Sequence, residues 1–359
     1  MLKKLQLYFI NSLKNILLKR GIILSRSGLS SKSIEKLEPF SVFADSKGNN
    51  FSLLKGYRDL IKPGWQNMFK IKLDLPKDKK SIIESALKKV CLIKKYLSIY
   101  NFYFDDINVL EVGCWGGADA YALVTLGVGH IDAIDIPNYG VRQNVDMDKK
   151  NSLHLKKQSE FLQKFRNFIA ESYLDMGYSD IEKKVMFFDK DIVNFDEREI
   201  YDLIISWETL EHIINPEIAL KNMFKALKPG GMCFHEYNPF FSIDGGHSLC
   251  TLDFPYGHIR LLPADFESYI RTYRPKELKV ALNFYYESLN RMTIAELMQY
   301  SKEVGFEVLD MHCFKCIDNL RVIDKIMFEQ CQNIYPSVIL SDMISKMVWI
   351  LLRKPVHLK

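Results

Sequence analysis

From about residue 81 onward, apolar and polar positions follow two patterns that predict helices and strands in turn. Short apolar runs predict strands at 109–112, 131–136, 185–188, 202–206, 232–237, 306–312 and 347–352. Between them, apolar residues recur at helical spacing, and the first such helix, at 81–100, carries Ile82, Ala86, Val90, Ile93 and Leu97. This alternation predicts an α/β fold, in which helices cover both faces of a mostly parallel sheet.

Local signals mark the limits of two later helices. One is predicted to begin at the Asn-Pro pair 215–216 and to run to the LKPGG motif, where proline and glycine stop it. Another is predicted to begin at a capping box formed by Thr293 and Glu296 and to end at Gly305.

The remaining segments suggest additions to the sheet. Residues 1–78 are mixed in character and are predicted to form an N-terminal helical extension to a domain that spans 79–355. Two insertions, 137–184 and 238–291, are longer than an ordinary link between strands. Both follow the carboxyl end of a predicted strand, which is where ligands bind on such sheets, so both are candidate lid or substrate-binding elements.

The segment 108–117, NVLEVGCWGG, is an apolar strand that ends in an acid and runs into a glycine-rich turn, and the next apolar run ends in Asp135. Glycines let the backbone approach a ligand closely, and the second acid can accept hydrogen bonds from a ribose diol. The glycine spacing does not fit G-x-G-x-x-G, which argues against a nicotinamide cofactor. The pattern therefore predicts a site for another nucleotide-like cofactor.

A series of motifs extends this prediction over about 81–355. In order, they are LEVGCWGG, AIDIP, FFDKDI, YDLIISWETLEHI, LKPGG and AELMQYSKEVGFEVL. The ordered set resembles the class I S-adenosylmethionine-dependent methyltransferases. The resemblance implies a Rossmann-like sheet of seven strands with helices on both faces. Two features depart from the family: a bulky Trp115 in the glycine turn and a long segment at 317–346. The Trp115 side chain must point away from the methionine end of the cofactor, or the loop must differ there.

The resemblance also implies which residues hold S-adenosylmethionine. Four residues of the first motif would cradle the methionine end, namely Glu111, Gly113, Cys114 and Gly116. Asp135, followed by Ile136, would hold the ribose. Asp191 and Ile192 would contact the adenine, with a turn cap as the alternative role of Asp191. Ser206 and Trp207 would line the methyl-transfer pocket.

The chemistry of methyl transfer to an oxygen atom makes the sequence ETLEH a candidate for the catalytic groups. An oxygen acceptor must lose its proton, either to a base or with the help of a metal. An ExxEH motif with a later histidine resembles the metal-binding set of small-RNA 2′-O-methyltransferases and of ubiquinone-pathway O-methyltransferases. It implies Mg²⁺, Mn²⁺ or Zn²⁺ bound by Glu208, Glu211, His212 and His258. Without a metal, His212 or His258 is the candidate base, and His247 is a third candidate.

These patterns predict an O-methyltransferase that acts on the hydroxyl of a small molecule or glycan. DGGHSL, PYGHIRL, DFESYI and LNRMT look like bacterial enzymes of sugar or surface-polysaccharide modification. The ExxEH motif suggests an RNA ribose 2′-O-methyltransferase as one alternative, and Trp115 suggests a catalytically inactive scaffold as another. Acids interleaved among the aromatic and basic residues near 253–271 argue against RNA. NPFF at 238–241 follows the fifth strand and lacks the second proline of NPPY, which argues against N-methylation of a base.

Bulk composition fits a cytoplasmic enzyme. The chain has 359 residues, 48% of them hydrophobic and 26% charged, and a net charge of +5, too small for a dedicated nucleic-acid binder. Its seven cysteines are scattered, and the one CxxC, at 313–316, is expected to be structural. Residues 1–20 form a basic amphipathic pattern. They are expected either to contact the inner face of a membrane peripherally or to pack on their own domain. The oligomeric state is left open.

Overall fold

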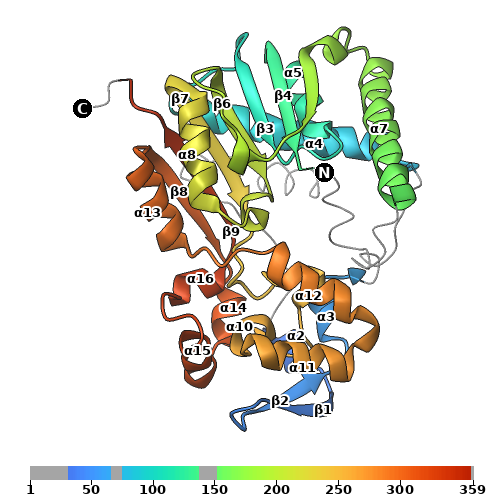
Figure 1. Ribbon diagram of the computed structural model, residues 1–359, viewed down its shortest axis with the longest axis vertical. Coiled ribbons are helices and arrows are strands. Elements are labelled where there is room, and N and C mark those ends of the chain that lie inside the picture. The colour runs from blue at the N-terminus through green and yellow to red at the C-terminus, as the bar shows by residue number, and fades with distance from the viewer. Residues whose placement is uncertain (1–30, 66–74, 137–151, 357–359) are drawn as a thin grey trace, which may run out of the picture.

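The computed structural model describes residues 31–65, 75–136 and 152–356. At its centre lies a seven-stranded sheet in the order β5-β4-β3-β6-β7-β9-β8 (Figure 1). The strands are β3 (Asn108–Val112), β4 (His130–Asp135), β5 (Val185–Asp189), β6 (Tyr201–Trp207), β7 (Leu227–Tyr237), β8 (Glu307–Lys315) and β9 (Ser345–Arg353). β9 is antiparallel to both of its neighbours, whereas the pairs from β5 to β7 are parallel. The seven predicted strands and the Rossmann-like class I methyltransferase fold are confirmed.

The direction of chain travel across the sheet reverses at β3. This strand pairs in parallel with β4 on one side and with β6, which comes much later in the chain, on the other. The loops that leave the carboxyl ends of β3 and β6 therefore diverge. Such a point is where ligands bind on an open α/β sheet.

Alternate residues of each strand face two different cores. Val109 and Leu203 face α4 (Lys79–Ser98), α5 (Ala118–Thr125) and α7 (Ser152–Asp175). Leu110 and Ile204 face α8 (Pro216–Ala226) and α13 (Ile294–Val304) on the opposite side. Both faces of the sheet are thus covered by helices, as Figure 1 shows.

The helix signals succeed in one case and partly fail in another. The capping box of Thr293 and Glu296 is present, and Gly305 ends α13 in a left-handed conformation. The helix α8 runs to LKPGG as predicted and ends at Ala226, but the motif itself is the first part of β7 and not a helix stop at Pro229 and Gly230. Pairing of Leu227 with Tyr201 in the neighbouring strand draws this motif into the sheet.

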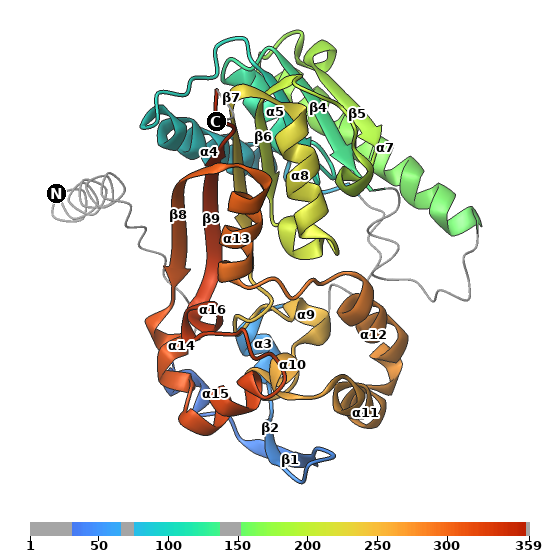
Figure 2. The same cartoon turned by 60° about the vertical axis from the view of Figure 1, so that its left-hand side comes forward.

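A second, smaller unit lies beyond the carboxyl end of the sheet (Figures 1 and 2). Its elements are α2 (Ser31–Ile34), β1 (Pro39–Ala44), β2 (Asn50–Leu54), α3 (Tyr57–Ile61), α9 (His247–Cys250), α10 (Gly257–Arg260), α11 (Pro263–Tyr273), α12 (Leu278–Glu287), α14 (Ile317–Val322), α15 (Lys325–Gln332) and α16 (Leu340–Ile344). These elements come from three stretches of the chain: α2 to α3, α9 to α12 and α14 to α16. One apolar core joins the three stretches, for example through Phe51, Phe254 and Met327. We call it the cap unit.

The cap unit corrects the prediction of a helical extension over residues 1–78. Residues 39–54 form an antiparallel hairpin of β1 and β2, not a helix. Ser46 binds the carboxylate of Asp265 through its backbone N–H and its hydroxyl, each at 2.9 Å. The described part of the N-terminal segment is thus built into the same unit as the predicted insertion 238–291. The amphipathic pattern of residues 1–20 lies outside the described residues.

Short 3-10 helices complete the fold: η3 (Ile181–Lys184), η4 (Ile192–Asn194), η5 (Leu210–His212) and η6 (Pro275–Glu277). The described part of the other insertion, 137–184, consists of α7 and η3, and α7 packs on α4 and α5. In the described part of the chain, no helix is both long and apolar enough to cross a membrane.

Candidate active site at the carboxyl ends of the strands

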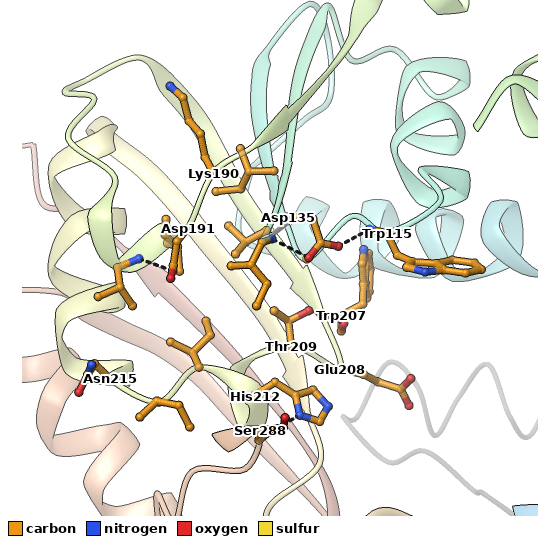
Figure 3. Close-up of a pocket in the computed structure, with 18 of the residues that line it drawn as sticks. Trp115, Asp135, Lys190, Asp191, Trp207, Glu208, Thr209, His212, Asn215 and Ser288 are labelled. Carbon is orange, nitrogen blue, oxygen red and sulfur yellow. Dashed lines mark hydrogen bonds between the residues drawn. The ribbon is translucent and has the colours of Figure 1, made fainter. Parts of the chain in front are cut away.

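A cavity of about 360 Å³ opens where β3, β4 and β6 end (Figure 3). Val112 and Gly113 contribute the end of β3, and 134–136 contribute the end of β4. The turn 190–193 and the segments 207–209 and 212–215 form the other walls, and Glu287 and Ser288 close the cavity from the cap unit. Its volume is within the range of about 300–1,000 Å³ typical of small-molecule sites.

The glycine turn lies close to the segment that follows β6. A Cβ at Gly113 would lie 2.2 Å from Thr209 Oγ1, and Gly113 has a positive φ of 79°. Cβ atoms at Gly116 and Gly117 would lie 2.3 Å from a ring atom of Phe165 and 2.4 Å from one of Phe187. These glycines are needed because the turn is packed against side chains of β5, α7 and the ETLEH segment.

Asp135 lies at the centre of the cavity wall (Figure 3). Its carboxylate accepts hydrogen bonds from the backbone N–H groups of Trp115 and Ile136, both at 2.8 Å. Burial raises the pKa of this carboxyl, while the two N–H groups and Arg166 act in the opposite direction. The side chain is thus held in one orientation, with carboxylate lone pairs remaining for a ligand.

Asp191 and Ile192 line the cavity one strand further along the sheet. Asp191 Oδ1 accepts a hydrogen bond of 3.0 Å from the N–H of Val193 and so caps η4. The turn-cap role considered as the alternative is therefore present together with a position in the cavity wall. Gly113, Asp135, Ile136 and Trp207 also line the cavity, as do Glu208 and His212.

Four residues of the expected cofactor set lie behind this wall: Glu111, Cys114, Gly116 and Ser206. Glu111 is fully buried, and its pKa is raised by burial and by Asp119. Burial likewise raises the pKa of Cys114. Ser206 Oγ lies 2.8 Å from His235 Nδ1 inside the sheet. These residues can shape the wall, but none of them lines the described cavity.

Trp115 is accommodated by helix α7. The residue is 52% exposed and its ring packs on Phe165, with 4.7 Å between ring centroids, and Trp115 is also among the residues that line the cavity. Arg166 donates from Nε to the carbonyl of Trp115 at 3.0 Å, and its guanidinium lies 4.2 Å from the Phe187 ring centroid. Sequence reasoning missed Arg166, since the insertion that carries it was considered as a lid.

Replacing Arg166 by methionine is expected to weaken binding of S-adenosylhomocysteine about 3- to 10-fold. The variant keeps the apolar stem but leaves a carbonyl of the glycine turn without its donor, a loss of about 1 kcal/mol or more. Lys164→Met, an exposed change on the same helix, is the matched control. Calorimetric dissociation constants check this, and equal values for both variants would show that Arg166 does not support the turn.

The turn that follows β6 brings a carboxylate and two imidazoles together. Potential ligand atoms of Glu211, His212 and His247 all lie within 4.8 Å of one another. Glu211 Oε1 accepts from the N–H of Asn238 at 3.3 Å. Glu211 Oε2 and His247 Nε2 are buried and have no hydrogen-bond partner among the described residues. Buried polar atoms are normally satisfied, so these two orphans are ligand atoms that a cation could bind.

The hydrogen bond of His212 assigns its tautomer. Nδ1 lies 2.7 Å from the carbonyl oxygen of Ser288 (Figure 3), and a carbonyl can only accept, so Nδ1 carries the proton. Nε2 is then the unprotonated nitrogen, as a metal ligand or a base requires. Burial lowers the pKa of His212 to about 4, which keeps the imidazole neutral at pH 7.

Two residues of the expected metal set, His258 and Glu208, lie outside the cluster. His258 is fully buried in the cap unit and donates from Nε2 to the carbonyl of Phe240 at 2.8 Å. It lines no part of the described cavity and does not belong to the cluster, where His247 takes its place. Glu208 is exposed at the cavity wall, outside the cluster, and accepts from Asn238 Nδ2 at 3.3 Å.

Glu211 gives the cluster a characteristic pH dependence. Burial raises its pKa from 4.5 to about 8. Because the folded state prefers the protonated acid, the stability it contributes is present below about pH 4.5 and is lost as pH rises to about 8. In metal-free buffer, Glu211→Gln is therefore expected to become more stable relative to the wild type between about pH 5 and pH 8. The gain is on the order of a few kcal/mol.

Thermal melts of both proteins in chelator at each pH measure this difference. Added Mn²⁺ should reduce the difference in stability between the two proteins at pH 8, because a cation binds only the ionised carboxylate of the wild type. A difference that stays constant with pH would mean that Glu211 titrates normally.

The sheet order, the glycine turn and the paired acids on β3 and β4 define the class: a Rossmann-like methyltransferase fold with its cavity at the reversal point. A family model described as a methyltransferase domain matches residues 87–310. The chain therefore belongs to this methyltransferase-domain family, and the expectation of a class I methyltransferase is confirmed.

Similar proteins include ubiquinone biosynthesis O-methyltransferases. The one from Rickettsia akari is 24% identical over 141 residues, which are 39% of this chain and 44% of that protein. The mitochondrial one from Dictyostelium discoideum is 27% identical over 130 residues, 36% of this chain and 35% of that protein. For Bartonella quintana the match is 25% identical over 212 residues, 58% of this chain and 69% of that protein. The first two matches cover less than half of the relative.

Solved structures show a weaker likeness. A putative sarcosine dimethylglycine methyltransferase from Galdieria sulphuraria is 12% identical with a TM-score of 0.45, covering 84% of this chain and 99% of that chain. A putative methyltransferase from Bacillus halodurans is 16% identical with a TM-score of 0.38, and the match covers 73% of this chain and 97% of that chain. Likeness at this level says nothing about the acceptor.

Proposed function

We propose that the protein is an S-adenosylmethionine-dependent O-methyltransferase that uses a divalent cation held by Glu211, His212 and His247. The proposed acceptor is the hydroxyl of a small molecule or of a glycan. The observation that carries the proposal is the cluster itself: the orphaned ligand atoms of Glu211 and His247 lie beside the imidazole of His212, whose tautomer is fixed and which lines the cavity. The names of the similar proteins support oxygen as the acceptor atom.

The cofactor assignment rests on the cavity wall. Asp135 would accept from the ribose hydroxyls, and Asp191 would accept from the adenine amine with Ile192 against the ring. The sulfonium would then lie toward the segment 207–212, near the cluster. In the transfer, the acceptor hydroxyl loses its proton to solvent, the bond from sulfur to the methyl carbon breaks as the bond from the acceptor oxygen forms, and S-adenosylhomocysteine leaves. Positioning of the two reactants supplies much of the acceleration.

One carboxylate with two neutral imidazoles suits Mn²⁺ or Zn²⁺, and Mg²⁺ if water completes the coordination. When bound, the cation would supply a Lewis acid that lowers the pKa of the acceptor hydroxyl. His212 holds its proton at Nδ1 and presents unprotonated Nε2 to the site. Glu287 and Ser288 of the cap unit would exclude water on the acceptor side.

Transfer of a radiolabelled methyl group from S-adenosylmethionine tests the proposal. A panel of phenols, catechols, monosaccharides and oligosaccharides serves as acceptors, with Mn²⁺ or with chelator. We expect an alkali-stable methyl ether on one acceptor, formed at least about tenfold faster with the cation. Label on an amine, or an equal rate in chelator, would overturn the acceptor or the metal part respectively.

A further inference from the structure

The turn that carries Glu211 and His212 is only three residues long and is held from outside by Asn290. The Nδ2 group of Asn290 donates to the carbonyl oxygens of Leu210 at 2.6 Å and Ile213 at 2.8 Å. Its backbone N–H donates to the carbonyl of Glu211 at 2.9 Å. One side chain, 8% exposed, thus satisfies carbonyls on both sides of the two ligand-bearing residues.

The amide of Asn290 can have only one orientation. Its Oδ1 accepts from the backbone N–H of Met292 at 3.1 Å, while Nδ2 faces two carbonyls. A flipped amide would place oxygen against two carbonyl oxygens and a donor against a donor. The position therefore requires a side chain that donates twice on one atom and accepts on the other.

Asn290 belongs to the linker 288–293, which joins α12 of the cap unit to α13 of the sheet unit. Ser288 at its start accepts the His212 proton, so the linker touches the same turn twice. Arg291 donates to the carbonyl of Tyr285 at 2.6 Å, and its guanidinium lies 4.6 Å from the Phe240 ring centroid. The linker is therefore anchored in the cap unit as well.

The far end of the linker is anchored by Asp342, which is fully buried. Its two oxygens accept from the N–H groups of Ile294 and Ile339, both at 2.9 Å. This fixes the start of α13 relative to α16. Because both ends of the linker are anchored, Asn290 is held in place and can fix the position of the turn Leu210–His212.

We propose that Asn290 is a positioning residue that sets the cation affinity of the cluster by holding the turn Leu210–His212, and that the linker couples the cap unit to the site. This rests on the proposed function, since it assigns Glu211 and His212 to a cation. Partners behind metal ligands typically change affinity about 10- to 100-fold when they are removed.

Asn290→Asp tests the proposal with a side chain of the same shape. It replaces the donating Nδ2 by an oxygen that repels the carbonyls of Leu210 and Ile213. We expect the Mn²⁺ dissociation constant, measured by calorimetry, to rise at least about tenfold. The dissociation constant of S-adenosylhomocysteine should change less than about threefold, since Asp135 and Asp191 are not touched. Asn333→Asp, an exposed change at the end of α15, is the matched control.

A second readout needs no metal. Long-range nitrogen–proton spectra of ¹⁵N-histidine protein report the tautomer of His212, which should be fixed with the proton on Nδ1 in the wild type and lost or mixed in Asn290→Asp. Asn290→Ser keeps one donor and serves if the aspartate variant does not fold. Its expected effect on Mn²⁺ binding is intermediate, about threefold, on the scale of one hydrogen bond.

The outcomes separate the two claims. If the wild type binds no Mn²⁺, the metal-assisted function fails, and the tautomer alone decides whether Asn290 positions the turn. If folded Asn290 variants keep both the wild-type tautomer and the wild-type Mn²⁺ affinity, the positioning role is overturned. An equal loss of Mn²⁺ and S-adenosylhomocysteine binding would mean a general structural role instead.

Discussion

Replacing Asp135 by alanine is expected to weaken binding of S-adenosylhomocysteine at least about 100-fold. A hydrogen bond to a charged group contributes about 1.5–3 kcal/mol, and a ribose diol would make two with this carboxylate. The change also removes the acceptor for the N–H groups of Trp115 and Ile136, which hold the glycine turn. Calorimetric titration of the metal-free protein measures the effect.

Asp189 supplies the control for this experiment. It ends β5 directly beside Asp135 in the sheet register, but it is exposed and does not line the cavity. Asp189→Ala should therefore bind S-adenosylhomocysteine within about twofold of the wild type. If the wild type itself does not bind, a catalytically inactive scaffold becomes the better account.

The second large effect is expected on the cation. Glu211→Gln should weaken Mn²⁺ binding by a factor on the order of 100, because it removes the only carboxylate of the cluster. His247→Gln should have a similar effect. Glu208→Gln should keep the wild-type affinity within about threefold, since Glu208 is exposed and outside the cluster.

The same titrations decide between two ligand sets. The ExxEH motif implied Glu208 and His258, whereas the geometry selects His247. A strong loss in Glu208→Gln together with wild-type affinity in His247→Gln would favour the set implied by the motif. Circular dichroism and melting temperatures of each variant show that the loss is not unfolding.

The sheet could be predicted from the sequence because its signals are local. Apolar runs marked all seven strands of this sheet, and the glycine turn after β3 and the acid that ends β4 marked the cavity. LKPGG shows the limit of such signals. Its proline and glycine stop helices in isolation, yet here the motif pairs with β6, and α8 ends before it. Tertiary pairing begins β7 at Leu227, five residues before the predicted strand start at 232.

The cap unit could not be predicted because its contacts are distant in sequence. Arg58 pairs with Glu277 at 3.0 Å, and Tyr256 donates to the carbonyl of Met343 at 3.0 Å. Nothing local in these three segments indicates that they share one core. A hairpin signal was present, since Gly48 lies in the polar turn between β1 and β2 with a positive φ of 81°, but the mixed composition around it suggested helices.

That the fold brings His247 to the cluster, and not His258, could not be predicted for the same reason. His247 and His258 both lie in the insertion after β7, and their sequence contexts do not rank them. In the folded chain His258 packs against Gly246 and donates to Phe240, so its ring supports the turn from which His247 reaches the cluster. Likewise, Asn290 and Arg166 donate hydrogen bonds to backbone carbonyls of other segments. Such contacts cannot be predicted from the sequence, because every residue has a backbone carbonyl.

The most direct test of the account is a diffraction measurement at the manganese absorption edge, on crystals grown with Mn²⁺ and S-adenosylhomocysteine. We predict one anomalous peak within about 2.3 Å of a ligand atom of each of Glu211, His212 and His247. The cofactor ribose should lie against Asp135 in the same map. No anomalous peak at the cluster, or a peak bound by Glu208 without His247, would contradict the metal-assisted methyl transfer proposed for this protein.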